Sequence, residues 1–306
     1  MRIRPPQKSP DQLRNVKILL GNEISRQIQV SFKMFKRPLS DYNEFQKVLN
    51  QAQNIVALTG AGVSAESGIP VFRGPGGLWR THRATDLATP QAFKANPALV
   101  WEFYHYRREV AFNSQPNKAH IALAKYEKIC QEQGRKFSVI TQNVDGLHKR
   151  AGSKNVLELH GCLQQVICTK CKIIEMNMNN PICEALRGRG DPSKKDQDLP
   201  IIQVKELPKC SKCQALVRPY IVWFGENLDP DVLENARELV ETCDLCLVIG
   251  TSSVVYPAAM FAPTVAERGK PVAEFNLSED PFDEEFSFHF SGPCGTTLPK
   301  ALGIDL

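Results

Sequence analysis

A glycine-rich turn directly after an apolar run constrains the fold of this chain more than any other feature. The apolar run covers residues 55–58, and Gly60–Gly74 then reads GAGVSAESGIPVFRG. Closely spaced glycines let a backbone turn sharply and let a phosphate approach its amides. The spacing Gly60-x-Gly62-x-x-Ala65 satisfies the relaxed dinucleotide-binding fingerprint. It also fits a plain connection between a strand and a helix, so the turn alone leaves both interpretations open.

The second half of this stretch predicts a loop. Gly68 and Pro70 lie two residues apart, and an ordinary α-helix does not continue through such an interruption. We therefore expect residues 67–74 to form a loop that folds over a bound ligand.

Further apolar runs predict the strands of a parallel sheet. They lie at residues 137–140, 156–159, 220–224, 245–249 and 271–275. The last two are each followed by a polar or glycine-bearing turn, as are the ligand-facing ends of strands in open parallel sheets. Residues 39–52 and 117–133 show helical spacing, and Asp41 and Glu44 are set as a capping pair for the first of these helices.

Residues 76–116 show no strand-like run and predict loops and helices rich in aromatic side chains. This stretch separates the chain from an ordinary dehydrogenase, whose fold needs a second strand that ends in an acid about 20 residues beyond the glycines. Asp86 has roughly this spacing, but no apolar run precedes it. The sequence therefore disfavours a hydride-transferring dehydrogenase.

Two Cys-x-x-Cys pairs predict a zinc site: Cys168 with Cys171, and Cys210 with Cys213. Ten cysteines without a secretory signal indicate a reducing compartment, where paired cysteines bind metal more often than they form disulfides. Four thiolates leave no open coordination position, so we expect a structural zinc that staples a small lobe without its own apolar core. A redox Cys-x-x-Cys pair is the alternative. The predicted fold class is α/β, a Rossmann-like parallel-sheet domain with a smaller zinc-binding lobe and a helical insertion.

Charge is concentrated at the start of the chain. Residues 1–38 hold nine basic and two acidic side chains, a net +7, whereas the rest holds 29 basic and 31 acidic, a net −2. A nearly neutral body argues against a nucleic-acid partner, including a zinc-ribbon DNA-binding module. No apolar run approaches the length of a membrane span, so we expect no membrane partner. The basic leader, residues 1–38, predicts a mitochondrial transit peptide, with a disordered basic tail as the alternative.

Several motifs, in this order along the chain, resemble those of the sirtuins, which are NAD-dependent protein lysine deacylases. They are GAGVSAESGIPVFRG, TQNVDGLH, ELHG, the two Cys-x-x-Cys pairs, WFGE and GTSS. WEFYHYRREV, VVYPAAMFAP and GPCGTTLP resemble the branch of the family that removes succinyl, malonyl and glutaryl groups in mitochondria.

The resemblance covers residues 39–306 and implies a catalytic domain there. Its Rossmann-like core would lie at residues 39–160 and 220–306, and its zinc-binding lobe at 161–219. The implied cofactors are NAD and one structural Zn²⁺, and the implied partners are proteins that bear acylated lysines. We expect a monomer or weak homo-oligomer in the mitochondrial matrix, with the cytoplasm and nucleus as further locations.

The resemblance also implies roles for single residues. His160 matches the catalytic general base, and Tyr104 and Arg107 match the pair that holds the acidic end of the acyl group. The other positions matched to substrate binding are Val222, Phe224, Gly225, Glu226, Val255 and Tyr256. The positions matched to NAD binding are Gly60, Ala61, Gly62, Ser64, Ala65, Phe72, Arg73, Trp79, Gln142, Asn143, Asp145, Gly250, Thr251, Ser252, Asn276, Leu277, Ser278 and Cys294.

Without the resemblance, several of these positions have plainer interpretations. A lone histidine such as His160 is more typical of a structural role, and Arg107 and Arg108 would both lie in solvent on an aromatic surface helix. Tyr104 and Arg107 are three residues apart, however, so on a helix they share a face and can bind one carboxylate. A plain acetyl group should then be a poor substrate. Within the family, deacetylation or mono-ADP-ribosylation is the alternative activity.

Overall fold

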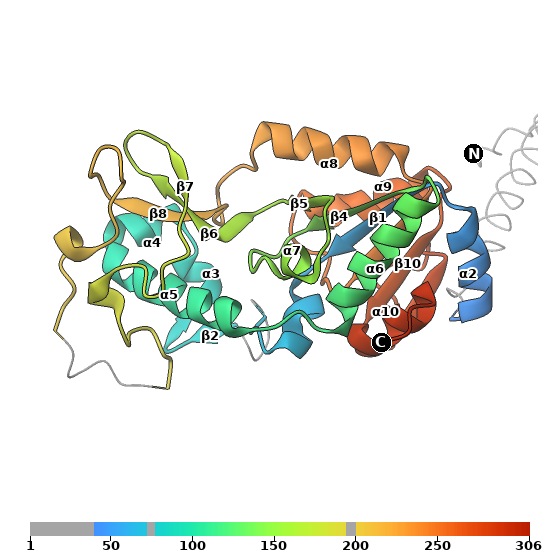
Figure 1. The fold of residues 1–306 in the computed structure, drawn as a ribbon, viewed down its shortest axis with the longest axis horizontal. Helices are drawn as coiled ribbons and strands as arrows, with labels where there is room; N and C mark the ends of the chain where they lie inside the picture. The colour runs from blue at the N-terminus through green and yellow to red at the C-terminus, as the bar shows by residue number, and fades with distance from the viewer. Residues whose placement is uncertain (1–39, 72–76, 194–199) are drawn as a thin grey trace, which may run out of the picture. The chain divides into compact units, whose positions relative to one another are not determined.

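The computed structural model describes residues 40–71, 77–193 and 200–306. The predicted leader, and Phe72 and Arg73 of the glycine-rich stretch, lie outside these residues. Within the described part of the chain, two sheets organise the fold: a six-stranded parallel sheet and a three-stranded antiparallel sheet (Figure 1). We call the parallel sheet with its helices the large lobe, and the antiparallel sheet with its helices the small lobe.

The large lobe is an open parallel sheet in the strand order β11-β10-β9-β1-β4-β5. Its strands are β1 (Asn54–Thr59), β4 (Lys136–Thr141), β5 (Val156–Glu158), β9 (Leu245–Ile249), β10 (Val272–Asn276) and β11 (Phe288–Ser291). β9 is buried along its whole length, as expected of a strand covered on both faces. These observations confirm the predicted parallel sheet.

Helices cover both faces of this sheet (Figure 1). One face packs against α2 (Tyr42–Gln51), α6 (Lys118–Glu132) and α10 (Cys294–Leu302). The other packs against α8 (Pro230–Thr242) and α9 (Phe261–Glu267). The carboxylate of Asp41 accepts from the first amides of α2, as predicted, whereas Glu44 pairs with Lys47.

The small lobe joins three strands to a helical segment. The strands are β6 (Gly161–Cys168), β7 (Ile174–Met176) and β8 (Val217–Ile221), and the helices are α3 (Ala84–Leu87), α4 (Pro90–Ala95) and α5 (Pro97–Asn113). One buried cluster includes Trp101 and Phe103 of α5 and Val166 of β6. Residues 161–219 therefore share their apolar core with helices from an earlier part of the chain.

Several strands differ from the sequence-based expectations. The apolar run at residues 220–224 begins earlier, as β8, and pairs with β6 instead of joining the parallel sheet. The stretch expected to lack strands forms a short hairpin of β2 (Leu78–Trp79) and β3 (His82–Arg83). A strand of two residues is too short to show the alternation of apolar and polar residues by which strands are predicted. β11 was not predicted either, because its apolar run is interrupted by His289.

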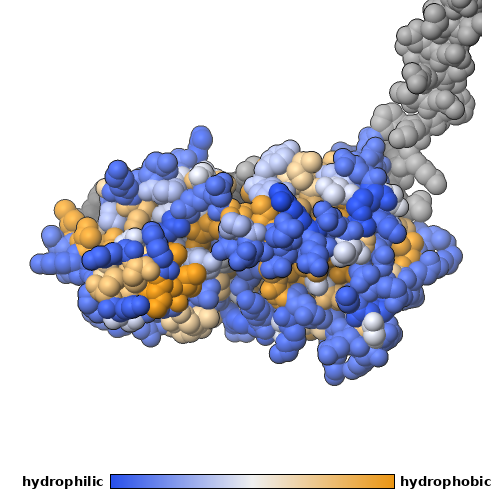
Figure 2. Space-filling view, turned by 90° about the horizontal axis from the view of Figure 1, so that it is seen from above, coloured by the Kyte–Doolittle hydropathy of each residue, from blue (hydrophilic) through white to orange (hydrophobic). Residues whose placement is uncertain are grey.

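The face seen in Figure 2 is largely hydrophilic, with hydrophobic patches. On the small lobe, Ile174 and Met176 of the edge strand β7 are exposed. Among the described residues, none of the helices combines the length and apolar character needed to cross a bilayer.

Candidate active site and metal centre

A cavity of about 930 Å³ opens where the strands of the large lobe end. The loops after β1, β4 and β9 line it, together with the end of β10. β1 lies between β4 and β9, so the strand order reverses at β1. Open α/β sheets bind ligands at this kind of reversal, outside the carboxyl ends of the strands. The position of the cavity therefore indicates a cofactor site.

The glycine turn after β1 packs directly on the turn after β9. The amide of Gly62 donates to the carbonyl of Gly250 over 2.7 Å. A Cβ atom at Gly62 would lie 2.7 Å from that same oxygen, and Gly250 itself has a φ of +57°. Both positions therefore require glycine. The close contact keeps backbone, with no side chain, at this edge of the cavity.

Polar side chains after β4 are held by a hydrogen-bond network. Asn143 Nδ2 donates to the Gly60 carbonyl at 3.0 Å and to Ser64 Oγ at 3.1 Å. The Ser64 hydroxyl donates to Asp145 Oδ2 at 2.8 Å. Burial raises the pKa of Asp145, although hydrogen bonds from the Leu147 amide and Ser64 counteract this effect. The amide and carboxyl groups are thus fixed at the cavity wall.

His160 lies between β5 and β6 and lines the same cavity. Its Nδ1 is 3.1 Å from the carbonyl oxygen of Gln142. A carbonyl can only accept, so Nδ1 carries the hydrogen and Nε2 keeps its lone pair. Burial lowers the pKa of His160 below its ordinary 6.5, against the raising effect of the Gln142 bond. The imidazole is therefore neutral at about pH 7 and has one nitrogen ready to accept a proton.

Tyr104 and Arg107, one turn apart on α5, both line the cavity with His160. Tyr104 is fully buried, and its oxygen accepts a hydrogen bond from Trp223 Nε1 at 2.9 Å. Burial lowers the pKa of the Arg107 guanidinium. The neighbouring Arg108 points elsewhere and donates to backbone carbonyls, among them that of Asn177 at 2.8 Å. The interpretation of both arginines as solvent-exposed is therefore wrong.

The segments matched to peptide binding also border the cavity. Val222, Phe224, Gly225, Glu226, Val255 and Tyr256 all line it. The amide of Val222 donates to the His160 carbonyl at 2.9 Å, which ties this segment to the candidate base. Phe224 and Tyr256 are exposed, as expected of side chains that meet a partner.

Most positions matched to NAD also line the cavity. They are Gly60, Ala61, Gly62, Ser64, Gln142, Asn143, Asp145, Gly250, Thr251, Ser252 and Asn276. The structure does not bring Ala65, Trp79, Leu277, Ser278 or Cys294 to the described wall of this cavity. Trp79 is buried in the small lobe and donates to the Gly190 carbonyl at 2.7 Å. Cys294 is buried at the start of α10.

Sequence reasoning missed the apolar part of the cavity wall. It includes Val144, Leu163, Leu228, Leu233 and Pro257. Leu233 lies in the first turn of α8. No local pattern separates such residues from core residues. Trp223 was visible within the WFGE motif, but only the structure shows its bond to Tyr104.

Four other histidines are buried without lining the cavity: His105, His120, His148 and His289. Burial lowers the pKa of His105 and of His120 to about 4, and that of His148 to about 3. The first three are therefore neutral under ordinary conditions, in agreement with the structural role expected for them.

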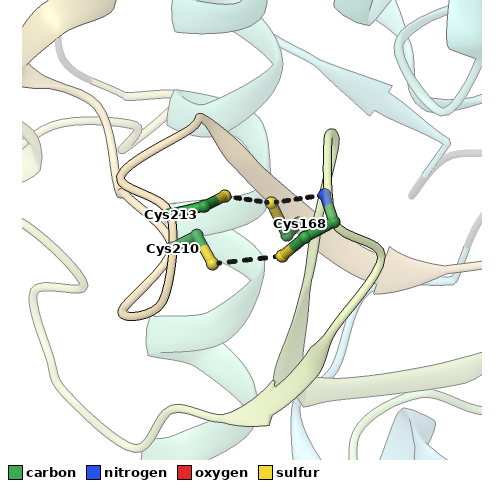
Figure 3. A group of neighbouring side chains, drawn as sticks. Cys168, Cys210 and Cys213 are labelled. Carbon is green, nitrogen blue, oxygen red and sulfur yellow. Dashed lines mark hydrogen bonds between the residues drawn. The ribbon is translucent and has the colours of Figure 1, made fainter.

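The four paired cysteines form a compact cluster in the small lobe (Figure 3). Their sulfur atoms all lie within 4.8 Å of one another. Cys168 and Cys213 are 3.4 Å apart, and Cys171 and Cys210 are 3.6 Å apart. Zn–S bonds of about 2.3 Å give tetrahedral S···S edges of about 3.8 Å, so the cluster fits one zinc ion. None of the four lines the cavity, which indicates a structural metal.

The comparisons with known proteins agree with this geometry. The sequence profile of the Sir2 family matches residues 60–257. An NAD-dependent protein deacylase of Daphnia pulex is 60% identical and aligns over 87% of this chain and 97% of its own length. The mitochondrial NAD-dependent protein deacylase sirtuin-5 of Canis lupus familiaris is 58% identical, over 87% of this chain and 86% of its own. This chain belongs to the Sir2 family.

Solved structures of the family superimpose on this fold. A Sir2 homologue in complex with NAD has a TM-score of 0.72 at 42% identity, and covers 87% of this chain and 94% of its own. A Sir2 variant bound to a p53 peptide and NAD has a TM-score of 0.68 at 32% identity, over 86% and 98% of the two chains. The resemblance inferred from the motifs is thus confirmed.

Proposed function

We propose that this protein is an NAD-dependent deacylase that removes succinyl, malonyl and glutaryl groups from protein lysines in mitochondria. The deacylase class is supported by family membership and by relatives that carry this name. The mitochondrial location is supported by the sirtuin-5 relatives of dog and zebrafish, both named mitochondrial. With one water molecule consumed, the products would be nicotinamide, the free lysine and acyl-ADP-ribose.

The cavity provides groups suited to each part of NAD. The turn that contains Gly60 and Gly62 has no side chains at these two positions, so the pyrophosphate can approach its backbone closely. Asn143 and Asp145, fixed by their network, can hold the carboxamide of nicotinamide. When bound, NAD supplies the ribose carbon to which the acyl oxygen becomes joined as nicotinamide leaves. His160 Nε2 can then take a proton from a ribose hydroxyl, which makes that oxygen a nucleophile toward the acyl carbon.

One observation carries the acyl preference: Tyr104 and Arg107 line the same cavity as His160. A guanidinium can bind both oxygens of a carboxylate, and a phenol can donate a further hydrogen bond. A carboxylate at the end of the acyl chain brings a negative charge, which compensates for the desolvation of the buried Arg107 guanidinium. An acetyl methyl group offers neither charge nor acceptor, so acetyl-lysine should be a poor substrate.

The substrates would be proteins whose acyl-lysine lies in an extended segment. We propose that residues Val222–Glu226 and Val255–Tyr256 bind this segment along its main chain, a mode that tolerates many sequences. Arg73 and Phe72 remain proposed cofactor residues. We also propose a monomer or weak homo-oligomer with no nucleic-acid or membrane partner.

The decisive experiment measures nicotinamide release from NAD with four versions of one peptide. Its lysine carries an acetyl, succinyl, malonyl or glutaryl group. We expect kcat/KM for the three acidic groups to exceed that for acetyl by about 100-fold or more. His160→Tyr should eliminate turnover of all four while NAD still binds. Equal turnover of the acetyl peptide would instead support plain deacetylation, and turnover by His160→Tyr would contradict the assigned base.

A further inference from the structure

A buried hydrogen bond links the proposed acyl pocket to a tryptophan outside α5. Trp223 Nε1 is 2.9 Å from the Tyr104 hydroxyl oxygen, and both side chains are buried while lining the cavity. An indole N–H can only donate, so the phenol oxygen must accept this bond. The hydrogen of the Tyr104 hydroxyl takes no part in this bond. Among the described residues, no second partner takes up the Tyr104 hydroxyl, so this proton is available to a ligand in the cavity.

Trp223 is itself held in place by a charged pair. Its backbone amide donates to Glu226 Oε2 at 2.9 Å. Arg218 of β8 donates to both oxygens of Glu226, at 2.8 and 3.0 Å. The Arg218 guanidinium also lies 4.1 Å from the centre of the Trp223 ring system. Phe93 packs against the indole with ring centroids 5.3 Å apart. These contacts fix the direction of the indole N–H.

We propose that Trp223 is a positioning residue for acyl selectivity: its N–H occupies the Tyr104 oxygen and so turns the phenol proton toward the carboxylate of the acyl group. This inference rests on the proposed function. A hydroxyl without the indole partner can rotate and can present its lone pairs to the cavity, where they repel a carboxylate. An acetyl group has no acceptor at this depth and should depend less on the indole.

The test compares succinyl- and acetyl-lysine versions of one peptide across four variants of the full chain. Trp223→Phe removes the indole N–H, Tyr104→Phe removes the hydroxyl, and a double variant removes both. Trp101→Phe is the matched control, because Trp101 is also buried and donates through Nε1, to the Val217 carbonyl at 3.0 Å. KM and kcat are measured for each peptide, together with KM for NAD and the temperature of unfolding.

We expect Trp223→Phe to lower kcat/KM for the succinyl peptide about tenfold, mainly through KM, the size expected for one hydrogen bond to a charged system. KM for NAD should be unchanged, and kcat/KM for the acetyl peptide should fall less than that for the succinyl peptide, so the ratio of succinyl to acetyl turnover drops. The double variant should be no worse than Tyr104→Phe alone, because both changes remove the same interaction. Trp101→Phe should lower the unfolding temperature while leaving the ratio of succinyl to acetyl turnover as in the wild type.

Two outcomes overturn the inference alone: a Trp223→Phe variant that keeps the wild-type selectivity, and additive losses in the double variant. A wild type without preference for the succinyl peptide would overturn the proposed function instead. Should Trp223→Phe fail to fold, benzothienylalanine at position 223 keeps the shape of the indole and removes only its donor. Loss of selectivity in that protein supports the inference, and retained selectivity overturns it.

Discussion

The large lobe is held together by parallel strands between two apolar layers, whereas the small lobe adds indole hydrogen bonds and a cysteine cluster to its apolar core. In the large lobe, parallel strands such as β1 and β9 pair over their whole length between two apolar layers. In the small lobe, the indoles of Trp79, Trp101 and Trp223 each donate one hydrogen bond across the core. The cofactor cavity uses the strand ends of the large lobe, and the proposed acyl pocket uses the side chains of the small one.

This difference predicts that the small lobe fails first when its metal site is damaged. Cys210→Ser removes one of four ligands, and structural zinc sites contribute folding free energy directly. We expect the unfolding temperature to fall by on the order of 10 °C and deacylation to be lost. Limited proteolysis should cut within residues 161–221 before it cuts the large lobe.

Cys183→Ser provides the matched control for this experiment, because Cys183 lies in the same lobe outside the cluster. Its unfolding temperature and activity should stay close to those of the wild type. If Cys210→Ser behaved like Cys183→Ser, the cluster would not hold a structural metal.

The next prediction compares two substrates in a variant of the proposed acyl pocket. Arg107→Met should lower kcat/KM for the succinyl peptide about 100-fold, because it removes a charged partner of the carboxylate. Acetyl turnover and KM for NAD, which do not require this charge, should be retained or improved. Arg108→Met changes the neighbouring arginine, and we expect a loss of stability there instead of a change in selectivity. Equal losses on both peptides in Arg107→Met would remove this residue from substrate recognition.

The next prediction concerns the pH dependence of turnover, which should follow the protonation of His160. Burial lowers the pKa of His160 below 6.5, and only the neutral imidazole can act as the base. As pH falls, activity should therefore persist below 6.5 and be lost only when the ring becomes protonated. The measurement is kcat/KM for the succinyl peptide against pH, with NAD binding followed over the same range. A midpoint at or above 6.5 would contradict the buried position of this ring.

The smallest expected effect concerns a buried histidine of the small lobe. His105 is fully buried; neither ring nitrogen makes a hydrogen bond to the described residues, and Nε2 lies 3.5 Å from Glu109 Oε1. Burial lowers its pKa to about 4. Below 6.5 the unfolded chain binds a proton that the folded chain does not, so folding stability is lost as pH falls toward 4.

His105→Phe should remove this acid sensitivity. We expect a gain of about 1 kcal/mol in unfolding free energy at neutral pH, since a buried polar group is replaced by an apolar one. The gain over the wild type should grow by up to about 1.4 kcal/mol for each pH unit below 6.5. Denaturant unfolding at several pH values measures it. A constant difference at all pH values would show that His105 takes up protons in the folded state.

The sequence was more informative for one lobe than for the other. Strands buried on both faces appear as continuous apolar runs, so most of the parallel sheet could be predicted. β11 was not predicted, because the buried His289, which is bonded to Glu274 at 3.0 Å, interrupts its apolar run. In the small lobe, the bond between Tyr104 and Trp223 joins residues 119 positions apart. No local spacing can predict such a contact, although the spacing of the cysteines did predict their cluster.

Helix α5 connects the two kinds of architecture in a single element. Trp101 on this helix is anchored to the small-lobe sheet, while Tyr104 and Arg107 face the cavity. Moving only the tyrosine and arginine into a distant relative should therefore transfer the acyl preference incompletely. A successful graft would need to carry Trp223, Arg218 and Glu226 as well, which makes the five side chains together the smallest transferable unit.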